Sequence, residues 1–276
     1  MRWTPGDRSN IEDMRGRSGR AVPLGIGGFV VLLLLSWATG TDFLSLFTQQ
    51  APSSQSVDTS RDRPTTTPAE ERMVDFVDAV TNDAQDTWAR LLGARYRRTQ
   101  VALFRDSVES ACGSADAATG PFYCPGDQKV YLDLGFFDEL SRRFGAPGDF
   151  AQAYVIAHEI GHHVQKVLGL GVGGPSRPGA NSASVAIELQ ADCFAGVWGH
   201  AASADGRFEA GHVQLEAGDA DEAIRAAGAI GDDRLQKMAT GRVMPDRFTH
   251  GTSAQRVEWF ERGMDSGDPR ACETSR

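Results

Sequence analysis

The chain has 276 residues, a formal net charge of −9, 41% hydrophobic residues and 24% charged residues. This length and composition are ordinary for a globular protein of one or two domains. The acidic balance supplies no large basic field for a phosphate backbone, so we expect no nucleic-acid partner.

Composition divides the N-terminal part of the chain into three segments. Residues 1–20 are polar, and residues 21–40 carry no charge over about the length that a helix needs to cross a bilayer. Arginines on the N-terminal side predict a single-pass transmembrane helix in the cell membrane, with a cytoplasmic N-terminus and an extracytoplasmic domain. A cleavable signal peptide and a buried core helix are the alternatives. Residues 41–67, rich in Ser, Thr, Pro and Gln, are interpreted as a flexible linker to a folded domain at 68–276.

The folded domain is expected to be α+β, mainly helical with a small β-sheet. Apolar residues at helical spacing predict helices at Pro68–Leu92, at Asp138–Phe144, from Asp149, from Asn181, at Ala217–Ala239 and at Thr252–Gly263. Short strands are predicted at Thr99–Phe104 and Lys129–Leu134. The stretch Ala217–Ala239 is either one helix or two with a break near Gly228–Asp232.

Four cysteines lie in this domain and form no C-x-x-C pair. In an exported domain, Cys112 and Cys124 would most simply close a disulfide loop. A second disulfide between Cys193 and Cys272 would pin the C-terminal tail. The alternative for Cys193 is a metal ligand or a nucleophile.

The stretch Tyr154–Lys166 (YVIAHEIGHHVQK) contains an H-E-x-x-H pattern. Positions i and i+4 share one face of an α-helix, so His158 and His162 can hold one Zn²⁺. Glu159 would then take a proton from a zinc-bound water. The missing side chain of Gly161 would leave room beside the metal.

A second apolar helix, from Asn181, carries Glu188 and Asp192 four residues apart. Catalytic zinc sites usually have three protein ligands, and Glu188 would be the third. Asp192, one turn later, would hydrogen-bond a ligating histidine and fix its tautomer. This E-x-x-x-D arrangement resembles the gluzincin type of zinc peptidase. A solvated helix face is the alternative, although the apolar neighbours of both carboxylates indicate burial.

Several segments together resemble the bacterial, membrane-anchored "putative neutral zinc metallopeptidase" family. The matching pieces are MRWTPGDRSNIEDMRG, GPFYCPGDQKVYLDLGFF, AHEIGHHVQ, ELQADCFAGVWG, AIGDD and FTHGTSAQR. The resemblance implies a zincin-like, zinc-dependent peptidase fold and a single N-terminal anchor. It also implies His158, His162 and Glu188 as the zinc ligands and Glu159 as the catalytic base.

Other polar residues are assigned by hypothesis. A tetrahedral oxyanion needs a second electrophile besides zinc, and His250 is the candidate, with Tyr154 and Tyr123 behind it. The alternative is that His250 positions the last helix. His163 faces away from the metal and is interpreted as a structural or surface residue. The strand Lys129–Leu134 is predicted to be the edge that pairs with an extended substrate.

We therefore expect a membrane-anchored zinc endopeptidase that acts on a peptide or protein substrate. The alternative is a non-catalytic, zinc-stabilised binding or scaffold module of the cell envelope. A structural zinc site has no need of Glu159, which favours the enzyme. A zinc hydrolase of non-peptide substrates is a third hypothesis, and another divalent metal could replace zinc.

Overall fold

The computed structural model describes residues 1–16, 66–116, 119–170, 177–204 and 211–274. The predicted transmembrane helix at 21–40 and nearly all of the predicted linker at 41–67 lie outside these residues. None of the helices in the described residues has both the length and the apolar character that a membrane span requires. Residues 1–15 and 66–276 form one compact unit.

The predicted helices are present. They are α3 (Pro68–Leu92), α4 (Gly135–Arg142), α5 (Asp149–Leu168), α6 (Ala183–Ala202), α7 (Asp219–Ala229), α8 (Asp232–Thr240) and α9 (Ser253–Ser266). Local chemistry explains some of their starts: Thr67 and Glu70 form a capping box at the start of α3, as do Thr252 and Gln255 at the start of α9. Of the two alternatives for 217–239, two helices with a break at Ile230–Gly231 are observed.

The strands are short. They are β1 (Arg2–Trp3), β2 (Ile11–Asp13), β3 (Gln100–Phe104), β4 (Ser107–Ser110), β5 (Gly113–Asp116), β6 (Phe122–Cys124), β7 (Lys129–Asp133) and β8 (Val213–Gln214). The largest sheet has the order β2-β3-β7-β6, in which only the β6–β7 pair is antiparallel. The strand predicted at Lys129–Leu134 is therefore not an edge, because β7 lies between β3 and β6. The edges of this sheet are β2 and β6.

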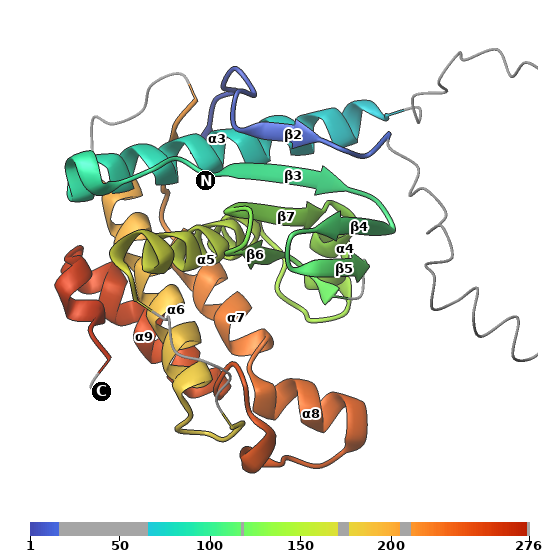
Figure 1. Ribbon diagram of the computed structural model, residues 1–276, viewed down its shortest axis with the longest axis vertical. Helices are drawn as coiled ribbons and strands as arrows, with labels where there is room; N and C mark the ends of the chain where they lie inside the picture. The colour runs from blue at the N-terminus through green and yellow to red at the C-terminus, as the bar shows by residue number, and fades with distance from the viewer. Residues whose placement is uncertain (17–65, 117–118, 171–176, 205–210, 275–276) are drawn as a thin grey trace, which may run out of the picture. The chain divides into compact units, whose positions relative to one another are not determined.

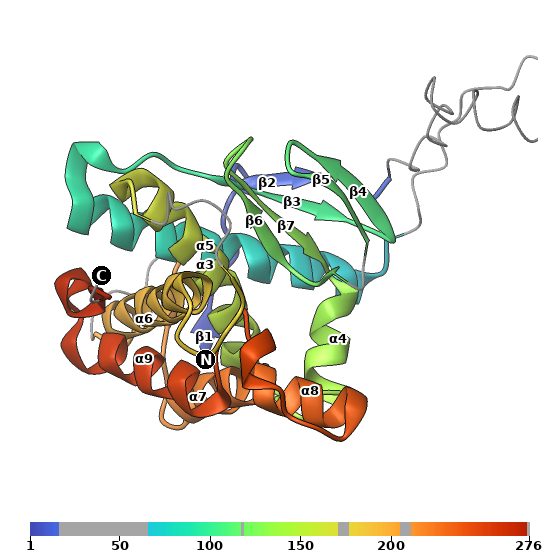
Figure 2. The ribbon, with the colours of Figure 1, turned by 60° about the horizontal axis from the view of Figure 1, so that its bottom comes forward.

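Helix α5 occupies the centre of the unit. It contacts α3, α6, α7 and the strands β6 and β7. The sheet and α3 lie on one side of α5, and α6, α7 and α9 lie on the other (Figures 1 and 2). Aromatic side chains fill the interior, such as Trp88 of α3 against Phe194 of α6, with ring centroids 5.2 Å apart. The expected α+β fold, mainly helical with small sheets, is confirmed.

Both predicted disulfides are confirmed. Cys112 is bonded to Cys124 in β6, and Cys193 in α6 is bonded to Cys272, 79 residues later. The second bond ties the C-terminal tail to the helix that carries Glu188. Because the sulfur of Cys193 is used in this bond, the alternative of a metal ligand or nucleophile is wrong.

The predicted domain boundary needs a correction. Residues 1–15 belong to the same compact unit as residues 66–276 and are not a separate segment. Strand β1 pairs with β8, and strand β2 pairs with β3 at the edge of the largest sheet. The prediction missed this because two- and three-residue strands carry almost no periodic signal, and their partners lie far along the chain.

Candidate metal centre

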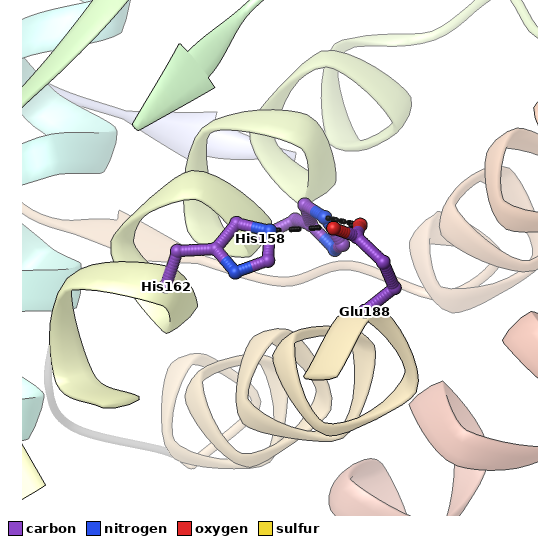
Figure 3. Close-up of side chains that lie close together, drawn as sticks. All are labelled: His158, His162 and Glu188. Atoms are coloured by element: carbon purple, nitrogen blue, oxygen red, sulfur yellow. Dashed lines mark ion pairs between the residues drawn. The ribbon is translucent and has the colours of Figure 1, made fainter. Parts of the chain in front are cut away.

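Three potential metal ligands meet between α5 and α6. His158 and His162 are one turn apart on α5, and Glu188 faces them from α6 (Figure 3). The Oε2 atom of Glu188 lies 3.3 Å from Nε2 of His158 and 3.6 Å from Nε2 of His162. The structure thus brings together the three residues that the sequence predicted as ligands.

This arrangement fits zinc. Ligands at about 2.0–2.1 Å from a tetrahedral zinc ion lie roughly 3.3 Å from each other. The three candidate ligand atoms all lie within 4.8 Å of one another, and two histidines with one carboxylate are a common catalytic donor set. Only small side-chain adjustments would be needed to bring the three atoms into a zinc coordination shell.

The Nδ1 atom of His158, on the side of the ring away from Glu188, is hydrogen-bonded to a carboxylate. It lies 2.7 Å from Oδ1 of Asp192, which is fully buried on α6. A histidine that donates its Nδ1–H to a carboxylate keeps Nε2 free for a metal. The predicted contact between Asp192 and a candidate histidine ligand is present, and the buried carboxylate contradicts the alternative of a solvated face.

Asp192 has a second partner that the sequence analysis missed. The guanidinium of Arg256, on α9, donates from Nε to Oδ2 at 2.9 Å and from Nη2 to Oδ1 at 2.8 Å. The hydroxyl of Tyr154 also donates to Oδ1 of Asp192, at 2.5 Å. The arginine lies 64 residues from Asp192 in the chain, so no local spacing could have indicated the contact.

His162 is held in a similar way by a residue that the sequence analysis also missed. Its Nδ1 lies 2.9 Å from Oε1 of Gln165, and Nε2 of Gln165 donates to the carbonyl of Ile187 at 2.7 Å. A signal existed here, because Gln165 follows His162 by three residues and must share its helix face. Both histidines therefore direct Nε2 toward Glu188.

The electrostatics of the centre favour a bound cation. Burial raises the pKa of Asp192, but the charges of Arg256 and His158 outweigh burial and hold it at about 2. Burial lowers the pKa of His158, whereas Asp192 and Glu188 raise it to about 10. Burial likewise raises the pKa of Glu188, but His162 and His158 hold it well below its usual range. Protons and a metal compete for the same imidazole nitrogens, so metal binding weakens as the pH falls.

The centre opens into a cavity of about 910 Å³. Glu159, the predicted base, lines this cavity beside both candidate histidine ligands, with 8% of its surface exposed. Gly161 has a different role from the predicted one. A Cβ atom at this position would lie 2.9 Å from the backbone oxygen of Ala191, so the glycine makes room for α6 and not for the metal.

The other candidate residues separate into two groups. His250 lines the cavity and is half-exposed, with Nδ1 3.3 Å from Oδ1 of Asp232. His163 is fully buried, with Nδ1 3.0 Å from the hydroxyl of Tyr123 and Nε2 2.5 Å from the carbonyl of Arg97. His163 is therefore structural and not a surface residue, and it engages the Tyr123 hydroxyl that was considered as an electrophile.

The walls of the cavity are mostly apolar and aromatic. They include β6 and its flanking prolines, parts of α4 and α8, and the segment around His250. Strand β6 is the sheet edge on this side, and Phe122 and Tyr123 of this strand line the cavity. This sheet edge and the three candidate ligands therefore line the same cavity.

The comparisons with known proteins agree with this geometry. The family model described as "Putative neutral zinc metallopeptidase" matches residues 1–275. The chain is similar to "Uncharacterized protein YpfJ" of Escherichia coli (strain K12), with 43% identity over 99% of this chain and 98% of that protein. It is also similar to "Uncharacterized protein Rv2575" of Mycobacterium tuberculosis (strain ATCC 25618 / H37Rv), with 45% identity over 71% of this chain and 68% of that protein. No solved structure gives a significant match.

Proposed function

The chain belongs to the "putative neutral zinc metallopeptidase" family, and on this premise we propose that it hydrolyses peptide bonds with Glu159 as general base. The observation that carries the proposal is the placement of Glu159 in a cavity beside His158, His162 and Glu188. A purely structural zinc site would use four protein ligands and would leave no open side.

A zinc ion held by His158, His162 and Glu188 would supply a Lewis acid that polarises a carbonyl oxygen and acidifies a water molecule. The carboxylate of Glu159 would take the proton from the attacking water and pass it to the leaving nitrogen. His250 would donate a hydrogen bond to the oxygen that gains charge. Asp192 and Gln165 would keep both imidazoles in the ligating orientation.

We propose a peptide or protein substrate that binds in extended form along β6. An extended chain can add to an exposed sheet edge through backbone hydrogen bonds. The aromatic lining at Phe122 and Phe136 favours apolar side chains in the substrate. The two disulfides favour an oxidising compartment for the domain. Attachment to the cell membrane through residues 21–40 is part of the proposal.

The test uses the full chain, because residues 1–15 belong to the folded unit. Bound zinc and cleavage of an unfolded protein would be measured for the wild type and for Glu159→Gln, which keeps the shape of the side chain and removes the base. We expect one zinc per chain in both proteins. Cleavage by the variant should fall by about 10²–10⁴-fold.

Three results would contradict the proposal. Equal cleavage by wild type and Glu159→Gln would show that the activity belongs to another site or to a contaminant. Retained zinc with no cleavage of any unfolded protein or peptide would favour the scaffold module. Cleavage of esters but not of peptides would favour a hydrolase of non-peptide substrates.

A further inference from the structure

The N-terminal residues pair with two strands that lie far along the chain. Strand β1 is antiparallel to β8, with Arg2 opposite Gln214. Strand β2 is parallel to β3, with Ile11 opposite Val101. Both views show β2 beside β3 (Figures 1 and 2). The segment 1–15 therefore supplies an edge of the largest sheet of the peptidase domain.

Ion pairs hold the same segment against α3. The guanidinium of Arg8 lies 2.7 Å from Glu71 and 2.6 Å from Asp75. Arg15, whose side chain is 2% exposed, lies 3.0 Å from Glu71 and bridges to Asp13 at 2.7 Å. A guanidinium as buried as that of Arg15 needs carboxylate partners, and α3 supplies Glu71 and, at 3.7 Å, Glu70.

The face of α3 that receives the segment is polar and buried. Asp78 is fully buried and accepts the backbone N–H of Arg8 at 2.8 Å. Gln85 is fully buried and donates to Oδ1 of Asn10 at 2.9 Å. Most buried polar groups in proteins are hydrogen-bonded, and the segment supplies partners for Oδ2 of Asp78 and for the amide of Gln85 on this face of α3.

The start of the chain reaches the helix that carries the histidines. The α-ammonium group of Met1 lies 3.4 Å from Asp149, the first residue of α5, and 3.1 Å from Asp219, the first residue of α7. Strand pairing, ion pairs and buried hydrogen bonds thus all join residues 1–15 to the domain.

We infer that residues 1–15 and residues 66–276 lie on the same side of any membrane to which this protein is attached. A chain that crossed a bilayer once between these two parts would put them on opposite sides and break every contact above. The expectation of a cytoplasmic N-terminus together with an extracytoplasmic domain is incompatible with this arrangement. The conclusion also holds if the segment pairs with the domain of a second copy, and it does not depend on catalysis.

The test labels two exposed positions with a membrane-impermeant maleimide. Ser9→Cys reports on the N-terminal segment, and Arg142→Cys, at a side chain that is 82% exposed, reports on the domain. Each full-length variant would be labelled in intact and in permeabilised cells. We expect either that both variants are labelled in intact cells or that both are labelled only after permeabilisation. Labelling of Arg142→Cys in intact cells, with Ser9→Cys labelled only after permeabilisation, would overturn the inference.

A second measurement remains informative if one of these variants fails to fold. Arg2→Cys and Gln214→Cys would place thiols on two residues that are opposite each other in the β1–β8 pair. A short, membrane-permeable bis-maleimide should join them in cells at several times the background of either single variant. Absence of this cross-link in a chain whose native disulfides have formed would also overturn the inference.

Discussion

Asp192 is the residue on which the geometry of the candidate metal centre most depends. Its two oxygens hold His158, Tyr154 and Arg256 at the same time, and all of these groups are buried. The arginine compensates the charge of the carboxylate, and the carboxylate sets the tautomer of the histidine. Replacing Arg256 on α9 should therefore change the orientation of His158, a candidate metal ligand, through Asp192.

Replacing Arg256 tests this dependence. Arg256→Met should lower the free energy of unfolding by about 3–5 kcal/mol, because the charge of Asp192 is left buried without its partner. The partly exposed Arg262 on the same helix, paired with Glu258, is the matched control. Arg262→Met should lower the free energy of unfolding by about 1 kcal/mol or less. Urea unfolding measures both, and equal costs would mean that Arg256 does not balance Asp192.

His250 leads to a prediction about pH. The hydrogen bond with Asp232 raises the pKa of His250 above its ordinary value, although burial lowers it. A group with a raised pKa stays protonated to a higher pH, so a cationic electrophile would be lost as the pH rises through that value. The kcat/KM of the proposed peptidase should therefore decline on the alkaline side.

Asp232→Asn provides the control for this assignment. The amide keeps an oxygen for the backbone N–H groups of Thr249 and His250, which Asp232 accepts at 2.7 Å. It removes the charge that raises the pKa of His250. The alkaline limb should shift to lower pH, and it should vanish in His250→Ala. An unchanged profile in both variants would assign the electrophile to another residue.

At the scale of elements, the distance between α5 and α6 sets the position of Glu188 relative to the histidines. The two helices pack closely at Gly161 and Ala191, where the backbone of α6 fills the space of a missing side chain. Two Gly→Ala substitutions can separate the effect of this packing on stability from the effect of helix propensity.

Gly161→Ala should lower the free energy of unfolding by about 1–3 kcal/mol, because the added methyl group would force α6 away. It should also weaken zinc binding, since Glu188 moves with α6. Gly228→Ala on α7 is the control, because its new methyl group would meet Val257 at an ordinary 3.7 Å. Helix propensity should then raise stability by up to about 1 kcal/mol. A stabilising Gly161→Ala would contradict the proposed packing.

At the scale of the whole molecule, the N-terminal segment leads to the clearest prediction. A chain that starts at Thr66 lacks β1, β2 and the buried Arg15, and it exposes the polar face of α3. We expect its melting temperature to fall by roughly 10 °C or more, since each kcal/mol corresponds to about 2–4 °C at this size. Thermal unfolding of the full and shortened chains measures the difference.

A peptide of residues 1–16 should restore part of the stability when added to the shortened chain, because it binds only the folded state. The same peptide with Arg8→Glu and Arg15→Glu should not, since both arginines pair with the carboxylate of Glu71 on α3. If the shortened chain were as stable as the full one, the segment would be an accessory and not part of the fold.

Local chemistry made much of the fold predictable. The capping box at Thr67 and Glu70 places the start of α3, and the apolar period places α5 and α6. The same period puts His158, Glu159 and His162 in their relative positions, because spacing on a helix converts directly into geometry. The two disulfides followed from the number of cysteines and the expected oxidising compartment.

The sequence by itself determined the helices and the relative placement of His158, Glu159 and His162, because each depends on residues a few positions apart, and the composition of the second helix singled out Glu188 as a candidate ligand. Only the tertiary structure decided that β6 and not β7 is the edge at the cavity, that Arg256 balances Asp192, and that residues 1–15 complete the sheet. The partners of the N-terminal segment lie far along the chain, as Arg2 and Gln214 do at 212 positions apart. Hydrophobic periodicity relates only residues that are close in the sequence. Distant partners are selected by shape, charge and hydrogen bonding in the assembled core.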